Sequence, residues 1–244
     1  MQHSARQLWV VRLGTMPYGE ALELQRAAAR ARITGAIPQD LLLLVEHEQV
    51  VTMGRTAKQR NLTASPELLA ARGVQLFEVE RGGDVTYHGP GQLVGYPIVD
   101  LKRHKQDLHW YLRQVEEALI VAIGEHGLSG ERSAGYTGVW TRGLAGAAIH
   151  PPRKIASIGV HARDWVTWHG FALNVTTELS CFDLIVPCGI AGVDMTSVSR
   201  ETGAPVALPD AEDAAVRGFS RVFSLEPAEV PVAALELEPA IADR

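Results

Sequence analysis

The sequence predicts an α+β fold in which a mixed, mostly antiparallel β-sheet is packed by helices on one side. Two observations indicate this fold: several strand-like segments follow one another along the chain, and only a few helical segments interrupt them. The length of 244 residues and the 46% of hydrophobic residues suit one domain with a substantial core. We expect that domain to span residues 1–224, followed by a loosely held tail over 225–244, where Pro, Ala and Glu occur without periodicity.

The first third of the chain predicts the centre of the sheet. A short apolar strand is expected at Leu8–Leu13, and a helix that Pro17 opens and Gly35 ends comes next. The strand Asp40–Glu46 contains an unbroken apolar run, which predicts burial on both of its faces. We expect Gln49–Met53 to continue that strand or to pair with it.

A compact helix and two strands are expected next. Ser65 is a typical N-cap ahead of a proline at the first helical position, and Gly73 ends this short helix before a strand at Gln75–Val79. Leu93–Leu101 is predicted to be another strand, and its internal Tyr96-Pro97 pair indicates an edge or a bulge.

The stretch between those strands, Arg81 to Gln92, predicts a pocket wall built from backbone. Gly82 and Gly83 lack a Cβ atom and so permit close approach to the main chain. A short strand over Asp84–Tyr87 and a Gly-Pro-Gly turn complete the stretch. The alternative is an ordinary surface hairpin.

The second half predicts a long helix, a run of strands and a last helix. Asp107 caps the longest helix, Leu108–His126, and a long loop is expected at Arg142–Arg153. The other expected elements are strands at Gly138–Thr141, Lys154–Ala162, Val166–Val175 and Met195–Ser199, and a helix at Pro209–Phe223.

Composition excludes several classes of protein. A net charge of −5 without a long basic run argues against nucleic acid as a partner. No signal-like N-terminus and no apolar run of membrane-spanning length is present, so we expect a soluble, cytoplasmic protein without membrane contact. The glycine pattern does not fit a dinucleotide fingerprint, and neither a phosphate loop nor a serine-hydrolase elbow occurs. Two cysteines and nine histidines show no metal-binding spacing, so we expect no metal site.

Two side chains remain as candidates for chemistry. Cys188 lies between Pro187 and Gly189, in a tight turn that would present its sulfur to a cleft, whereas Cys181 is expected to be a small buried hydrophobe. Lys154 leads an otherwise apolar strand and is therefore at risk of partial burial. The alternative for this lysine is that its ammonium group reaches solvent.

Four segments together resemble the octanoyltransferases of lipoate biosynthesis, the lipoyl(octanoyl) transferase family. They are residues 81–97, Lys154–Val160, His169–Asn174 and Pro187–Ile190, and the resemblance extends over roughly 8–223. It implies the single-domain fold of the biotin and lipoate protein ligases. Those ligases share the pocket lysine, so the cysteine of Pro-Cys-Gly is what distinguishes a transferase from an ATP-dependent lipoate or octanoate ligase.

The resemblance implies an enzyme that transfers an octanoyl group from acyl carrier protein to a lysine of a lipoyl domain, without ATP or a metal. Cys188 would carry the acyl group as a thioester. A cysteine thiol ordinarily has a pKa of about 8.5, so it needs a neighbouring ammonium or a neutral amine, and Lys154 suits either role. A non-catalytic acyl-binding protein is a third hypothesis.

The resemblance also implies three walls of an acyl site. For Gly159 and Gly170 the alternative is a β-bulge, and for His88 it is a turn cap. The implied wall residues are Arg81, Gly82, Gly83, Asp84, Val85, Thr86, Tyr87 and His88, then Ser157, Ile158 and Gly159, then Gly170, Phe171 and Ala172.

The implied partners are octanoyl-acyl carrier protein and the lipoyl domains of 2-oxoacid dehydrogenases and of the glycine cleavage H protein. These partners are expected to be acidic, and this chain is itself acidic overall, so a local basic surface is needed. Two clusters are candidates, although each is also compatible with a solvated loop: Arg55, Lys58 and Arg60, or Lys102, Arg103, His104 and Lys105.

Overall fold

The computed structural model describes residues 6–147 and 150–237 and confirms an α+β fold with a mixed, mostly antiparallel sheet. Among the described residues, the strands of the large sheet pair in parallel only at β11–β1 and β1–β2. The eight strands of this sheet, in spatial order, are β11 (Glu226–Glu229), β1 (Gln7–Thr15), β2 (Asp40–Glu46), β6 (Gln92–Ile98), β10 (Val166–Asn174), β9 (Arg153–Arg163), β8 (Gly138–Leu144) and β7 (Leu128–Glu131).

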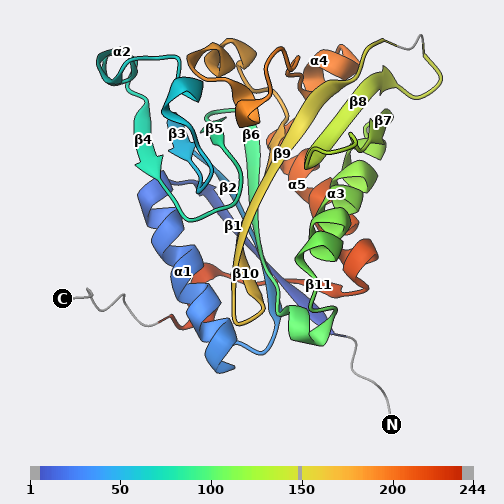
Figure 1. Cartoon of the computed structure of the whole chain (residues 1–244). Coiled ribbons are helices and arrows are strands. Elements are labelled where there is room, and N and C mark those ends of the chain that lie inside the picture. The colour runs from blue at the N-terminus through green and yellow to red at the C-terminus, as the bar shows by residue number, and fades with distance from the viewer. Residues whose placement is uncertain (1–5, 148–149, 238–244) are drawn as a thin grey trace.

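Helices cover both faces of this sheet, so the expectation of helices on one side is wrong. Helix α1 (Tyr18–Thr34) lies on one face, and α3 (Leu108–Gly124) and α5 (Leu208–Phe223) lie on the other (Figure 1). The apolar run of β2 explains the arrangement, because successive side chains of a strand point to opposite faces. Leu41, Leu43 and Val45 pack in the α1 core, and Leu42 and Leu44 pack in the α3/α5 core.

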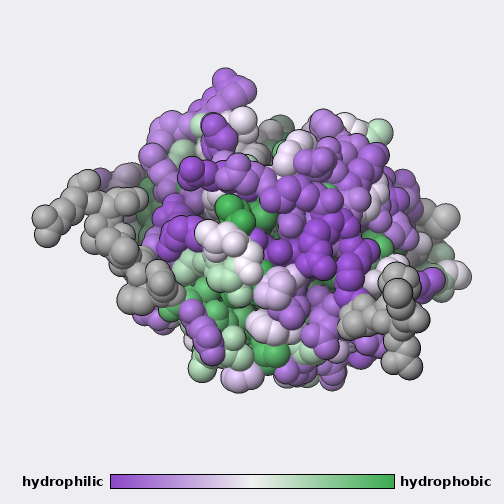
Figure 2. All heavy atoms as spheres, turned by 90° about the horizontal axis from the view of Figure 1, so that it is seen from below, coloured by the Kyte–Doolittle hydropathy of each residue, from purple (hydrophilic) through white to green (hydrophobic). Residues whose placement is uncertain are grey.

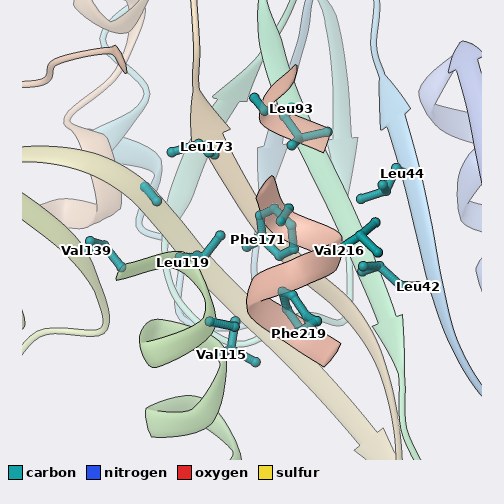
Figure 3. Packing of buried hydrophobic residues seen from close by; sticks show 14 of the residues in the cluster. Leu42, Leu44, Leu93, Val115, Leu119, Val139, Phe171, Leu173, Val216 and Phe219 are labelled. Carbon is teal, nitrogen blue, oxygen red and sulfur yellow. The ribbon is translucent and has the colours of Figure 1, made fainter. Parts of the chain in front are cut away.

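The α3/α5 core is built around two stacked aromatic rings. Phe171 of β10 lies 5.5 Å from Phe219 of α5, measured between ring centroids, and Val216 packs beside them (Figure 3). Gly95 of β6 makes room for this ring, since a Cβ atom there would lie 2.2 Å from Phe171 Cζ. The side chain of Phe171 therefore points away from the α1 face.

A second sheet of three strands stands beside the large one, in the order β4 (Gln75–Glu78), β3 (Val50–Met53) and β5 (Val85–His88). The expectation that β3 continues or pairs with β2 is therefore wrong, because its two edges are occupied by β4 and β5. Short helix α2 (Pro66–Ala71) leads into β4, and the Ser65 side chain caps it as expected.

Two further expectations are corrected near the C-terminal end. Residues 225–237 are not loosely held: β11 pairs with β1, and Leu225 and Leu235 are buried. Met195–Ser199 is not a strand, because Met195 makes only an isolated bridge to Lys154 and α4 (Val198–Thr202) begins after its Ser197 cap. Residues 148–149 of the expected loop and 238–244 of the expected tail lie outside the described residues.

Strand β6 lies inside the sheet, so Pro97 does not mark an edge. The pairing of β6 with β10 stops at Gly95 and Phe171 and resumes with a bridge between Asp100 and Val166. His169 stands opposite Pro97 in this interval, with a φ of +55°, and its N–H donates to Gln25 Oε1 of α1 at 3.0 Å. The proline thus redirects the backbone of β10 at His169 without shifting the register.

Most of the surface at the end seen from below is hydrophilic, with a limited apolar area (Figure 2). Among the described residues, none of the helices combines the length and the hydropathy that crossing a membrane requires.

Candidate active site

A cavity of about 200 Å³ opens on the α1 side of the large sheet, between that sheet and β5 of the small one. It brings Cys188 and Lys154 together with all three predicted walls. Its lining consists of Tyr18, Arg81, Gly83, Asp84, Thr86, His88, Val94, Tyr96, Gly135, Tyr136, Thr137, Lys154, Ser157, Ile158, Gly159, His169, Gly170, Phe171, Ala172, Cys188 and Ile190.

Cys188 sits in the middle of a single 3-10 turn, Pro187–Gly189. Its φ of +55° is in the left-handed region that residues with a side chain rarely adopt. The N–H groups of Gly189 and Ile190 donate to Val186 O and Pro187 O at 2.9 and 3.0 Å, so these two donors are engaged within the turn. No carbonyl of the described residues accepts from the N–H of Cys188 itself.

The turn that carries the cysteine rests on Asp84. Gly189 permits this contact, because a Cβ atom there would lie 2.5 Å from Asp84 Oδ2. The same oxygen accepts from Asn61 Nδ2 at 2.6 Å, and Asp84 Oδ1 accepts from the N–H of Val85 at 2.8 Å. Asp84 therefore packs closely against the turn, and both of its oxygens are already hydrogen-bonded elsewhere.

Lys154 reaches the sulfur from β9. Its Nζ lies 3.2 Å from Cys188 Sγ and 3.4 Å from Thr137 O, and the residue is only 1% exposed. The Nζ also lies over the ring of Trp140, 4.8 Å from the centroid. An ammonium group has three N–H donors, and this environment supplies two acceptors and an aromatic face.

A bulge in β9 directs two side chains to the same sulfur. Pairing with β8 shifts between Val139 opposite Ala156 and Trp140 opposite Lys154, which leaves Ile155 as an extra residue. Ile155 and Ala156 both pack in the α3/α5 core, so Lys154 and Ser157 both face the cavity despite their odd spacing. Ser157 Oγ lies 3.6 Å from Cys188 Sγ. Gly159 and Gly170, where bulges were the alternative, pair directly with each other.

Within the wall from Arg81 to His88, strand β5 contributes alternate residues, and the loop before it contributes three more. Arg81, Gly83, Asp84, Thr86 and His88 line the cavity. Two predicted members of this wall, Val85 and Tyr87, instead point into the apolar cluster beneath the small sheet. Gly82 does not line the cavity either, since its N–H donates to Val160 O at 2.8 Å and ties the wall to β9.

The third wall is supplied mostly by backbone. Phe171 turns its ring into the opposite core, and Gly170 and Ala172 on either side of it line the cavity. Position 170 must be glycine because a Cβ atom there would lie 2.1 Å from Gly95 O of β6.

Arg81 is a buried cation of the cavity wall. It is 7% exposed and donates to Thr52 Oγ1, Thr52 O and Gly82 O. Within the described residues no carboxylate forms an ion pair with it. Burial lowers the pKa of its guanidinium, although arginine stays protonated at neutral pH.

Sequence reasoning missed several lining residues. Tyr96 and His169 lie inside the segments that carried the resemblance, and their place in those segments was the available signal. Tyr18 is the first residue of α1 and gave no signal, because only the tertiary fold brings that helix end to the cavity. Within the described ranges, no group of three or more His, Cys, Asp or Glu side chains is arranged to hold a metal ion.

The fold and the site define a class: a single α+β domain in which a buried lysine contacts a cysteine inside a pocket on one face of the sheet. Residues 17–220 match the family described as the lipoyl protein ligase A/B catalytic domain. An octanoyltransferase of Koribacter versatilis is 50% identical over 216 residues, which cover 88% of this chain and 83% of that protein. An octanoyltransferase of Acidobacterium capsulatum is 50% identical over 223 residues, covering 88% and 89%. The chain belongs to the lipoyl protein ligase A/B catalytic domain family.

Solved structures agree with this fold. A bi-partite lipoate protein ligase from Thermoplasma acidophilum superposes with a TM-score of 0.71 at 17% identity, covering 94% of this chain and 90% of that one. At such low identity the likeness establishes the fold alone.

Proposed function

We propose that this protein is an octanoyltransferase that moves an octanoyl group from octanoyl-acyl carrier protein to a lysine of a lipoyl domain, through a thioester on Cys188. The observation that carries the proposal is the 3.2 Å contact between Lys154 Nζ and Cys188 Sγ inside a buried pocket. The octanoyltransferase relatives support the choice of acyl group.

In the first half-reaction, Sγ of Cys188 attacks the carbonyl carbon of the incoming thioester. The new C–Sγ bond forms as the C–S bond to the carrier breaks, and the proton that the thiol loses passes through Lys154 Nζ to the departing carrier thiolate. An ammonium beside the sulfur stabilises the attacking thiolate. The N–H of Cys188, which no carbonyl of the described residues engages, is a backbone donor available to the developing oxyanion.

In the second half-reaction, the amine of the acceptor lysine attacks the acyl carbon on Cys188. The C–N bond forms, the C–Sγ bond breaks, and Lys154 accepts the proton that the attacking nitrogen sheds. The product is an amide, the cysteine is regenerated, and the thioester supplies the driving force. We therefore propose that neither ATP nor a metal ion takes part.

The test is intact-mass analysis after incubation with octanoyl-acyl carrier protein and no ATP. We expect one octanoyl adduct on the wild type and on Cys181→Ala, and both should transfer the octanoyl group to a lipoyl domain. Cys188→Ala should show neither the adduct nor the transfer. Cys181→Ala is a matched control, because Cys181 does not line the cavity and packs instead against the apolar cluster beneath the small sheet. ATP-dependent transfer that survives Cys188→Ala would instead establish the ligase alternative.

We further propose that the cluster Arg55, Lys58 and Arg60 receives the acidic carrier protein. All three are exposed and, within the described residues, none forms an ion pair. The segment lies against the pocket wall, since Arg55 N–H donates to Arg81 O at 3.0 Å and Lys58 N–H to Asp84 Oδ1 at 3.3 Å.

The other candidate cluster is less suited. Lys102 and Lys105 pair with Asp100 and Asp107 at 3.9 and 3.0 Å, and His104 contacts Asp40 at 2.7 Å. Leu101 N–H donates to Trp165 O, which places this cluster at the β9–β10 hairpin, away from the end of β9 that carries Lys154.

Charge reversal distinguishes the two clusters. Arg55→Glu with Lys58→Glu should raise the KM for octanoyl-acyl carrier protein about tenfold at low salt and leave the rate with a small octanoyl thioester unchanged. Lys102→Glu with Lys105→Glu is the matched control and should change neither. Equal effects on both donors, or a larger effect of the control pair, would reject this surface.

The acceptors that we propose are the lipoyl domains of 2-oxoacid dehydrogenases and the glycine cleavage H protein. We also propose that the protein acts in the cytoplasm. Both of its cysteines are free thiols, which suits a reducing compartment.

A further inference from the structure

The end of the cavity away from Cys188 is polar, although it would receive the hydrocarbon end of an acyl chain. Tyr18, His88, Tyr96 and His169 line it, and they are 2%, 7%, 3% and 2% exposed. An apolar chain alone does not explain four buried polar side chains in this lining.

The strand register shows where these residues lie relative to the sulfur. Ser157, which contacts Cys188 Sγ, pairs with Ala172, and Ala172 pairs on its other edge with Val94. Tyr96 lies two residues further along β6, roughly 7 Å beyond Val94 at the usual rise of a strand. His169 lies three residues beyond Ala172 in the same direction.

Hydrogen bonds fix the role of the Tyr96 hydroxyl. His47 Nδ1 lies 2.8 Å from Met16 O, which can only accept, so Nδ1 carries the proton. His47 Nε2 must then accept from the Tyr96 hydroxyl at 2.6 Å. Burial lowers the pKa of His47 to about 4, in agreement with a neutral ring. The Tyr96 oxygen is left with acceptor capacity alone.

The same reasoning makes His88 an acceptor toward the cavity. Gln92 Nε2 donates to Asn174 Oδ1 at 2.9 Å, so Gln92 Oε1 accepts from His88 Nδ1 at 2.8 Å. His88 Nε2 is therefore unprotonated, and no described residue donates to it. The Tyr18 ring stacks on His88, 6.0 Å between centroids, and Tyr18 also lines the cavity.

We propose that this polar end of the cavity selects the length of the acyl chain and the polarity of its last atom. This inference rests on the proposed transferase function. An eight-carbon chain stops short of the acceptors and leaves them to water. A longer hydrocarbon would displace that water and bury His88 Nε2 without a donor, which is unfavourable. A chain that ends in a hydroxyl group supplies the missing donor and is accepted.

The test compares two donors of equal size, the 8-hydroxyoctanoyl and nonanoyl thioesters of N-acetylcysteamine. We expect the wild type to use the hydroxylated chain about tenfold better by kcat/KM. Tyr18→Phe and His88→Leu should each bring this ratio toward one and raise the use of decanoyl relative to octanoyl. Tyr111→Phe removes a hydroxyl buried in the opposite core, bonded to Pro97 O, and should leave the ratio unchanged.

A binding measurement separates this inference from the proposed function. Calorimetry on Cys188→Ala should show tighter binding of 8-hydroxyoctanoate than of nonanoate, whether or not the protein transfers acyl groups. Equal affinities and equal rates in the wild type would mean that a purely steric end limits chain length. A wild-type preference that both variants retain would show that other residues read the chain end. Melting curves of each variant verify folding.

Discussion

The contact between Lys154 and Cys188 depends on a third side chain that the sequence did not single out. Trp140 presents its ring to Lys154 Nζ at 4.8 Å, on the strand that the β9 bulge faces. An aromatic face stabilises an ammonium but not a neutral amine. In the proposed mechanism, Trp140 is thus a positioning residue that holds the Lys154 ammonium beside the sulfur.

Replacing this ring should make the cysteine less reactive. For Trp140→Leu we expect iodoacetamide alkylation of Cys188 at pH 7 to slow between about 2-fold and 30-fold, as the loss of roughly 0.5–2 kcal/mol from a cation–π contact requires. Trp140→Phe should recover part of the rate. Trp165→Leu, at a half-exposed tryptophan of the β9–β10 hairpin, is the control. An unchanged rate in Trp140→Leu would remove the ring from the mechanism.

At the scale of elements, the site is assembled where a short turn, a bulged strand and the small sheet meet. The turn at Pro187–Gly189 presents the sulfur, and Asp84 of the loop before β5 packs against that turn. The bulge at Ile155 then brings Lys154 onto the same face as Ser157. Each element places one part of the contact, so a shift in any of them separates Lys154 Nζ from Cys188 Sγ.

The close packing of the turn against Asp84 can be tested by adding a single Cβ atom at Gly189. Gly189 and Gly192 both have positive φ, +67° and +71°, but a Cβ atom would strike Asp84 Oδ2 only at Gly189 and would meet open space at Gly192. Both alanine variants should lose about 1–2 kcal/mol from backbone strain. Only Gly189→Ala should also lose activity, by on the order of 100-fold. Urea unfolding and kcat/KM check this, and equal activities in the two variants would contradict it.

At the scale of the whole molecule, residues that follow the last helix add the edge strand of the large sheet. After α5 the chain returns to the far edge of the sheet, where β11 pairs with β1, and the turn Val232–Leu235 then packs on the α1 core. This segment covers an edge that β1 would otherwise expose.

The contribution of this segment should appear in stability and not in catalysis. Leu235 is 2% exposed and Val232 is 46% exposed, within the same turn. Leu235→Ala should lower the free energy of unfolding by about 2 kcal/mol or more, whereas Val232→Ala should change it by less than about 0.5 kcal/mol. Urea titrations measure both, and a Leu235→Ala value equal to that of Val232→Ala would show that the segment contributes little.

Stability should also depend on pH because two buried histidines, His47 and His88, are neutral in the folded protein. Burial lowers the pKa of His47 to about 4 and that of His88 to about 3, from an unfolded value near 6.5. Below pH 6.5 these two histidines bind protons in the unfolded chain but stay neutral in the folded chain. The stability that they contribute is therefore greatest above pH 6.5, and it falls as the pH drops toward their folded-state pKa values. Each histidine contributes a slope of about 1.4 kcal/mol per pH unit.

Urea unfolding at pH 7, 6 and 5 measures this slope, and His88→Gln isolates one histidine. The free energy of unfolding of the variant should fall less steeply with decreasing pH than that of the wild type, by about 1.4 kcal/mol per pH unit. Parallel curves for the two proteins would mean that His88 takes up a proton in the folded state.

The local pattern of the chain predicted much of the fold. The apolar run of β2, the capped helices α2 and α3, and the strands β9 and β10 follow from periodicity and capping residues, which act over a few neighbours. The segments that resemble a family predicted Cys188 and Lys154 as a pair. These features are encoded in contiguous residues, and a sequence displays them directly.

Only the tertiary structure decided which side chains share the cavity. Tyr18 reaches it because α1 lies on one particular face, and Val85 and Tyr87 leave it because β5 alternates over a separate core. The β11 strand forms because a distant edge offers unpaired backbone groups to a segment with little strand preference of its own. Such outcomes depend on contacts between residues far apart in the chain, and those contacts exist only once the sheet and its two helical layers have packed.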